Sequence, residues 1–160
     1  MTDPQPVMEA AAALLAVRQR SIAETSERLA KQGYPQPLVN EVVTRLIEMR
    51  YLDDEEFARS WVESRDRARP RGQHGLRREL SLKGVPREII DGVMVAREES
   101  AAGEDPDLAA AKALLTRKSA SLIREADINK RRQKAYALLA RNGFDPDTCR
   151  EAIHAEFPRS

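Results

Sequence analysis

One short pattern occurs three times in the sequence and restricts what the chain can fold into. A leucine is followed four residues later by a glycine, and the residue after the glycine is aliphatic or aromatic. The copies are residues 29–34, 80–85 and 139–144. Glycine readily adopts the left-handed conformation that ends a helix, and the next apolar side chain then folds back on the last turn. Each copy therefore predicts the end of one helix and the start of another.

The residues after each glycine repeat as well. Pro35, Pro86 and the pair Asp145-Pro146 suit the first turn of a helix. Hydrophobic or small side chains then follow five, six, nine and ten residues after the glycine, a spacing that forms one apolar stripe on a helix. They are Leu38, Val39, Val42 and Val43 in the first copy, Ile89, Ile90, Val93 and Met94 in the second, and Thr148, Cys149, Ala152 and Ile153 in the third.

A further helix is predicted before each of these pairs. The first runs from about Pro6 to Arg18, the second starts at Asp53 and the third starts at Asp105. Ser21 with Glu24 has the spacing of a capping box, in which two residues cap a helix start reciprocally. We therefore expect an all-α fold of three tandem three-helix repeats in an elongated curved array, with repeats at 1–50, 51–100 (central and basic) and 101–160.

Composition limits the partners and the cellular compartment that are expected for this chain. The chain of 160 residues has a net charge of only +1, so any electrostatic attraction to a partner must be local. A single cysteine, Cys149, excludes an internal disulfide and suits a reducing compartment. The longest apolar run, residues 10–17, is too short to span a bilayer. We expect a cytoplasmic protein that does not attach to membranes.

The charges are strongly segregated along the chain. Residues 59–87 hold nine arginines and lysines against three acids, and residues 117–141 hold eight against two, so each stretch has an excess of six positive charges. Such stretches are usually solvated helix faces. However, Arg67, Arg69 and Arg71 are crowded where we expect a loop, which favours a partner-binding role. Aromatic residues are not interleaved with them, so the pattern predicts contact with phosphates or protein carboxylates rather than with bases.

No residue pattern indicates catalysis. The acidic run from Asp53 to Glu56 resembles a metal site, but helix capping and interaction with the helix dipole explain it better. Cys149 aligns with the stripe residues Val39 and Ile90, which predicts a core position. The glycines are scattered and form no phosphate-binding loop. We therefore expect no enzyme, no metal and no cofactor.

The second repeat carries a family resemblance. Its motifs are Tyr51-Leu52-Asp53-Asp54-Glu55-Glu56-Phe57-Ala58, Trp61-Val62-Glu63-Ser64-Arg65, Arg71-Gly72, Leu76-Arg77-Arg78-Glu79-Leu80 and Lys83-Gly84-Val85. This run closely resembles the RecX family of bacterial recombination regulators, and the flanking repeats also look like those of that family. One departure is the stretch 67–75, which is richer in glycine and proline than a plain Arg-Gly helix start.

The resemblance implies a function in DNA repair, homologous recombination and the SOS response. Family members bind the RecA recombinase and its filament on single-stranded DNA, inhibit its ATP hydrolysis, strand exchange and co-protease activity, and need no cofactor. We expect a monomer that contacts RecA, with weak direct DNA binding. The residues predicted to contact the partner or DNA are Arg65, Arg67, Arg69, Arg71, Arg77, Arg78, Lys83, Lys130, Arg131 and Arg132.

Two alternatives remain open at this point. Helices joined at glycines also permit a direct DNA-binding regulator of the helix-turn-helix type. The chain could also be a purely protein-binding helical adaptor. In that case, charge reversal at Arg77 and Arg78 would leave partner binding intact.

Overall fold

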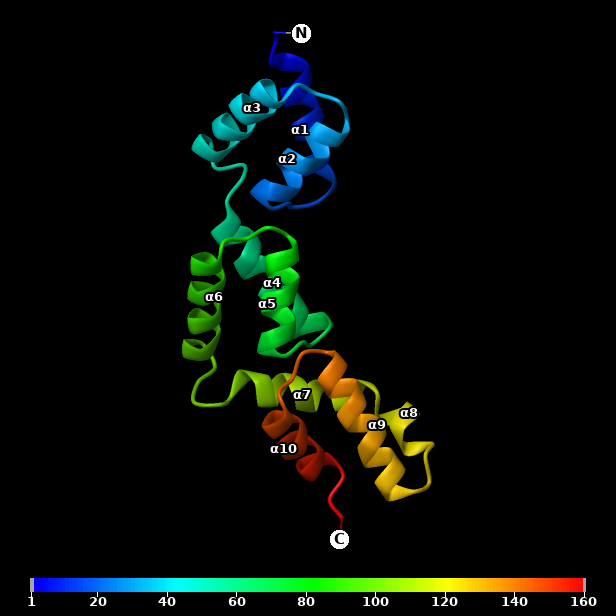
Figure 1. Cartoon of the computed structure of the whole chain (residues 1–160). Helices are drawn as coiled ribbons and strands as arrows, with labels where there is room; N and C mark the ends of the chain where they lie inside the picture. The colour runs from blue at the N-terminus through cyan, green and yellow to red at the C-terminus, as the bar shows by residue number, and fades with distance from the viewer. Residues whose placement is uncertain (1, 160) are drawn as a thin grey trace. The chain divides into compact units, whose positions relative to one another are not determined.

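The computed structural model describes residues 2–159, and every regular element in that stretch is a helix (Figure 1). In chain order the helices are α1 (Gln5–Val17), α2 (Ile22–Lys31), α3 (Gln36–Glu48), α4 (Asp54–Ala68), α5 (Gln73–Leu82), α6 (Arg87–Glu99), α7 (Pro106–Arg117), α8 (Ser119–Ile123), α9 (Ile128–Arg141) and α10 (Pro146–Glu156). The predicted all-α class is confirmed.

The three predicted helix ends are confirmed in detail. The backbone φ angles are +94° at Gly33, +76° at Gly84 and +89° at Gly143, all in the left-handed region. After each glycine, the amide of the next residue donates to the carbonyl of the repeated leucine, at 3.4, 3.1 and 3.2 Å respectively. These bonds satisfy carbonyls that would otherwise lack a partner at the end of a helix.

The predicted helix starts are also confirmed. Ser21 and Glu24 form the reciprocal capping box at the start of α2. Asp105 caps α7 and Asp145 caps α10, each followed by proline in the first turn. The carboxylate of Asp53 accepts the Glu56 amide at 3.1 Å at the start of α4.

One local expectation was wrong, and one local feature was not anticipated. The unanticipated feature is the short helix α8, which lies in the connection between α7 and α9, two of the three main helices of the third repeat. A single turn of five residues with no side-chain cap leaves little signal in a sequence. Arg67 was expected in a loop but lies in α4, which continues to Ala68 because Pro70 is the first residue that cannot extend it.

Backbone contacts divide the chain into two compact units. Unit 1 contains the residues up to Ser60 together with Leu80–Ile90, and unit 2 contains Trp61–Glu79 together with the residues from Asp91 onward. The division falls inside the expected middle repeat. The repeat boundaries at residues 50 and 100 remain a prediction.

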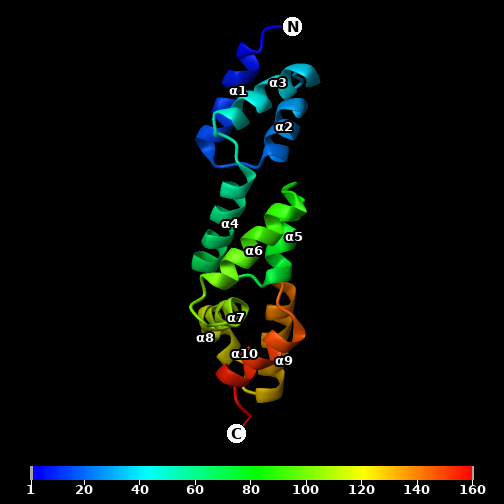
Figure 2. The same cartoon turned by 90° about the vertical axis from the view of Figure 1, so that its left-hand side faces the viewer.

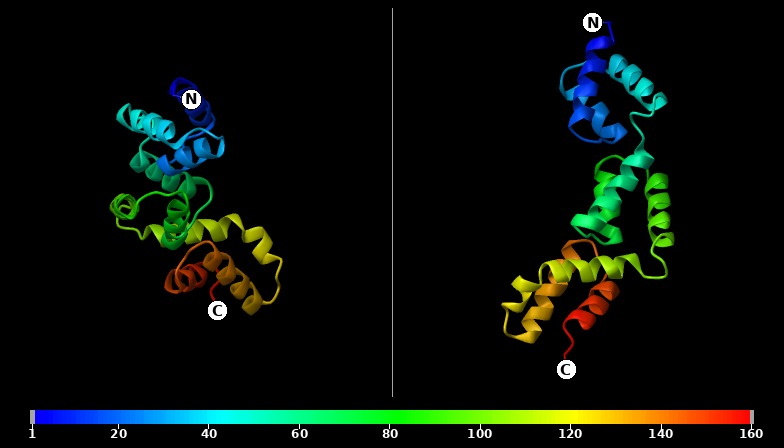
Figure 3. Two further views of the ribbon diagram at one scale, coloured as in Figure 1. Left: turned by 45° about the horizontal axis from the view of Figure 1, so that its top comes forward. Right: turned by 180° about the vertical axis from the view of Figure 1, so that it is seen from behind.

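Each unit contains an aliphatic core made by the predicted stripes. In unit 1, α1, α2 and α3 pack together around Val7, Leu29 and Val39, which are fully buried (Figure 2). In unit 2, α10 packs against α7 and α9 around Leu139 and Cys149 (Figure 3). Cys149 is therefore the core residue that its place in the stripe predicted.

The same helix junction occurs once in each unit. In unit 1, the hydroxyl of Ser21 donates to the Lys83 carbonyl at 2.5 Å, and the Asp54 carboxylate accepts the Ile22 amide at 2.9 Å. The start of α4 thus caps the start of α2, and the capping residue of α2, Ser21, in turn binds a free carbonyl at the end of α5. The positive end of the α2 dipole then faces the negative end of α5 and a carboxylate.

In unit 2 the corresponding elements repeat this junction one step along the chain. The Gly72 amide donates to the Asn142 carbonyl at 3.0 Å, and the Asp107 carboxylate accepts the Gln73 amide at 2.9 Å. The end of α9 and the start of α7 thus cap the start of α5. Capping of a neighbouring helix by Asp54 and Asp107 was not anticipated, because Asp54 was expected to act within its own helix and no role was predicted for Asp107.

Glu24 should make the unit 1 junction pH-dependent. Burial tends to raise the pKa of Glu24, but hydrogen bonds from Arg18, the Ser21 amide and Lys83 outweigh it and hold the pKa at about 2, below the ordinary value of 4.5. The charged form therefore stabilises the fold above pH 4.5, and this contribution disappears as the pH falls through 2. We expect Glu24→Gln to lower the free energy of unfolding by up to about 3 kcal/mol at pH 7.

Urea unfolding of the wild type and Glu24→Gln between pH 7 and pH 2 measures this contribution. Glu27→Gln is the matched control, because Glu27 is an exposed carboxylate whose pair with Lys31 should contribute less than about 1 kcal/mol. The two stability curves should converge near pH 2. A constant difference across the range would show that the Glu24 charge does not stabilise the junction.

Candidate nucleic-acid and partner interface

Six of the ten predicted contact residues already have partners within the fold. Arg65 is the most fully engaged. It binds Glu79 through two hydrogen bonds of 2.6 and 3.1 Å, and its guanidinium lies 5.0 Å from the centroid of the Trp61 ring. Trp61 also donates to Glu79 at 3.2 Å. This cluster links α4 to α5, so Arg65 is a structural residue whatever else it contacts.

The other five engaged residues bind different groups. Arg71 lies 4.0 Å from the Glu79 carboxylate, and Arg77 pairs with Asp91 at 2.6 Å. Arg131 donates to the Glu125 carbonyl and lies over the Phe157 ring, and Arg132 donates to the Phe157 carbonyl. In unit 1, Lys83 pairs with Glu24 at 3.2 Å.

The remaining four predicted residues have exposed side chains. They are Arg67, Arg69, Arg78 and Lys130. Within the part of the chain that the structure describes, none of these four side chains forms an ion pair. Their charges are therefore available to an incoming partner.

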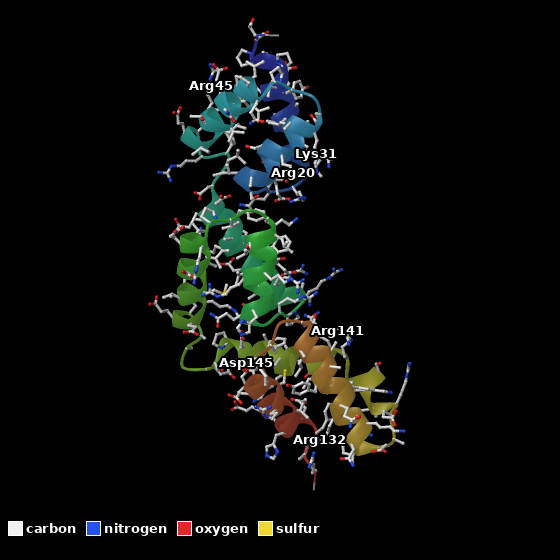
Figure 4. All side chains as sticks on the ribbon, viewed as in Figure 1. Arg20, Lys31, Arg45, Arg132, Arg141 and Asp145 are labelled. Atoms are coloured by element: carbon white, nitrogen blue, oxygen red, sulfur yellow. The ribbon has the colours of Figure 1, made fainter. Side chains whose placement is uncertain are left out.

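Unit 2 has an open hollow of about 870 Å³ with a positively charged lining, which we call the basic hollow. Its wall comes from the α4–α5 connection and from α7, α8 and α9. No acidic residue lines it, whereas six basic residues do: Arg69, Arg71, Arg117, Lys118, Lys134 and Arg141. Figure 4 shows Arg141 at the end of α9. The remaining surface includes the apolar side chains of Leu114, Leu122 and Leu138.

The fold neutralises only part of this charge. Lys134 pairs with Glu125 at 3.0 Å, and Arg71 has the more distant Glu79. Arg117 donates to the carbonyls of Ala68 and Arg67, both at 2.8 Å, which holds the end of α4 but supplies no counter-charge. Burial lowers the pKa of Arg71, and the nearby charge of Arg65 lowers it further. Burial and the Arg65 charge therefore both disfavour the charged form of Arg71, and a bound anion would favour it.

A buried arginine, Arg97, contacts the α4–α5 connection, which lines the hollow, through the Arg71 carbonyl. The Arg97 side chain is only 6% exposed and binds Asp66 through two hydrogen bonds of 3.0 Å and Asp107 at 2.5 Å. Asp107 in turn caps the start of α5 at Gln73. Burial acts to lower the pKa of Arg97, but its two carboxylate partners outweigh this effect and raise it. Arg97 therefore ties together α4, α6 and α7.

Sequence reasoning found only part of the basic hollow. Arg69 and Arg71 were predicted as contacts, but Arg117, Lys118, Lys134 and Arg141 were not. A signal for these four existed, because all lie in the basic stretch 117–141. Arg97 was missed entirely, since its role depends on carboxylates that only the fold brings together.

The described residues contain no cluster of three or more histidine, cysteine or acidic side chains arranged to hold a metal ion. In residues 2–159, no helix is long and apolar enough to cross a membrane.

These features define a class of helical-repeat protein with a basic hollow, and comparison with known proteins gives the family. Models of the first, second and third three-helix domains of RecX match residues 8–46, 53–94 and 105–153. Regulatory protein RecX of Chlorobium phaeobacteroides (strain BS1) is 32% identical over 98% of this chain and 97% of that protein. The chain belongs to the RecX family of regulatory proteins.

Other relatives and solved structures agree with this assignment. Regulatory protein RecX of Mycolicibacterium vanbaalenii is 32% identical over 90% of this chain and 78% of that protein. The crystal structure of RecX from Lactobacillus salivarius superposes with a TM-score of 0.76 over 95% of both chains at 17% identity, which shows a common fold. The predicted family is confirmed, as are its three-helix domains.

Proposed function

We propose that this protein is a non-catalytic regulator of the RecA recombinase. It binds RecA and its filament on single-stranded DNA in the cytoplasm, as a monomer without a cofactor, and lowers the ATPase, recombination and co-protease activities of RecA. The observation that carries the proposal is membership of the RecX family across nearly the whole chain. The basic hollow of unit 2 supports it, because a DNA-bearing filament is a large negatively charged partner.

The proposed contacts fall into two groups. Arg67, Arg69, Arg78 and Lys130 are exposed, so their side chains can reach a filament without breaking an internal ion pair. The other six predicted residues form hydrogen bonds or ion pairs within the fold, and these contacts stabilise the packing of the helices that carry the exposed group. We therefore assign direct contact to the exposed group and positioning to the rest.

Binding to a filament would lower turnover by a shift in population. A ligand that binds one state of an assembly more tightly than another shifts the equilibrium toward that state. A protein that contacts neighbouring RecA subunits would favour one filament state and suppress the cycling that ATP hydrolysis requires.

ATP turnover by RecA already assembled on single-stranded DNA tests this proposal. We expect added wild-type protein to lower turnover several-fold. The charge-reversed variant Arg67→Glu/Arg69→Glu/Arg78→Glu should lose most of this effect, because repulsion replaces attraction at the contact surface. The matched control reverses three exposed arginines elsewhere, as Arg28→Glu/Arg45→Glu/Arg87→Glu, and should retain inhibition.

Co-sedimentation with the filament separates binding from inhibition. Unchanged turnover at excess protein, with no protein in the filament pellet, would contradict the proposal. If the protein bound and inhibited equally well with either set of reversals, the family function would stand but the assigned contacts would be wrong.

A further inference from the structure

The end of α4, in the second three-helix domain, is held by a side chain from the third. The Arg117 guanidinium, at the end of α7, donates one hydrogen bond to the Ala68 carbonyl and one to the Arg67 carbonyl, both at 2.8 Å. These carbonyls belong to the last turn of α4, where no amide of the helix itself is left to bond them. The guanidinium also faces the negative end of the α4 dipole, which strengthens both bonds.

The backbone that Arg117 holds carries two exposed cations. Arg67 lies in the last turn of α4 and Arg69 follows it, and both are assigned to direct contact with the filament. The Arg69 amide donates to the Arg65 carbonyl at 2.9 Å, which continues the hydrogen-bond pattern of α4 to this residue. Helix ends fray unless other contacts hold them. Arg117 therefore holds the turn that sets the direction of both side chains.

We propose that Arg117 is a positioning residue for filament binding, which fixes the last turn of α4 so that Arg67 and Arg69 are presented in one direction. This inference rests on the proposed function. Two side chains on an ordered backbone lose less conformational entropy on binding than two on a fraying helix end. A residue of the third three-helix domain thus sets the affinity of contacts that the second domain makes.

Replacement by lysine separates positioning from direct contact. Lysine keeps the positive charge and can still contact an anion, but its single ammonium does not reproduce the two parallel bonds of the guanidinium. Arg117→Lys should raise the protein concentration for half-maximal inhibition of RecA ATP turnover about five-fold, within the range of coupling between contacting residues. The matched control is Arg141→Lys, at an exposed arginine of the same unit, and it should change this concentration less than about two-fold.

A double-mutant cycle shows whether Arg117 acts through Arg67 and Arg69. In the background Arg67→Gln/Arg69→Gln, inhibition should be weaker but measurable, because Arg78 and Lys130 remain. Arg117 bonds to backbone carbonyls, so these substitutions leave its acceptors in place. Adding Arg117→Lys to this background should change the half-maximal concentration by less than about two-fold, since no cationic side chains are left at 67 and 69 to position.

Amide hydrogen exchange gives a second readout that needs no RecA. In the free protein, the Arg69 amide should exchange several-fold faster in Arg117→Lys than in the wild type. The midpoint of urea unfolding should shift little, because the Arg117 side chain is exposed. Unchanged exchange at Arg69, or an equal loss of inhibition from Arg117→Lys in both backgrounds, would overturn the proposal. A wild-type protein that does not inhibit RecA would instead refute the proposed function, on which the positioning role depends.

Discussion

Replacing Arg97 by alanine should lower the free energy of unfolding by about 3–5 kcal/mol, because it leaves a buried carboxylate without its cation. Arg97 is nearly inaccessible and binds both Asp66 and Asp107. The Asp107 side chain is only 12% exposed, so its carboxylate would be solvated much less than an exposed one after the guanidinium is lost. Urea unfolding of the wild type and Arg97→Ala measures the effect as a lower midpoint at unchanged slope.

Two further variants distinguish charge from packing at Arg97. Arg97→Ala/Asp107→Asn should be less destabilised than Arg97→Ala, since the loss of packing is the same but neither buried charge remains, and the introduced amide oxygen can still accept the Gln73 amide. The control Arg59→Ala removes an exposed arginine that pairs with Glu56 and should cost less than about 1 kcal/mol. Equal losses in Arg97→Ala and the double variant would show that lost packing, not an uncompensated charge, is responsible.

Arg97 also shows which features of the fold cannot be predicted from a single sequence, namely ion pairs between distant helices. The helix ends at Gly33, Gly84 and Gly143 were predicted because their cause is local: glycine alone adopts positive φ without strain. The caps at Ser21 and Asp145 are equally local. By contrast, Asp66 and Asp107 lie 31 and 10 residues from Arg97, and no periodicity relates them. Long-range pairs of this kind become visible only when the helices are placed.

The candidate site divides in the same way. The sequence indicated where positive charge is concentrated, and the stretches 59–87 and 117–141 supply the whole basic lining of the hollow. It did not indicate which arginines are neutralised. Arg65 and Arg77 each meet an acid 14 residues away on another helix, whereas Arg69 and Arg78 meet none in the described chain. The distribution of charge along the sequence therefore predicts where basic residues gather. The ion pairs in the fold determine which of these residues are not neutralised.

Replacing Gly143 by alanine should be more destabilising than the same change at Gly33, although both glycines have similar positive φ angles. A side chain at either position pays a conformational cost of about 1–2 kcal/mol. At Gly33 a Cβ atom would meet nothing within 4 Å, but at Gly143 it would lie 2.2 Å from the Gly75 amide nitrogen and 2.4 Å from its Cα. Moving backbone atoms aside requires a large distortion, so Gly143→Ala should lower the free energy of unfolding by roughly 1–3 kcal/mol more than Gly33→Ala does.

This difference tests whether the end of α9 rests against the start of α5. Relief of the clash would separate the two helices and lengthen the bond from the Gly72 amide to the Asn142 carbonyl. Unfolding of Gly143→Ala and Gly33→Ala in urea gives the stability difference. Equal stability losses for the two variants would mean that the left-handed backbone alone requires glycine and that the close approach of the two helices contributes nothing.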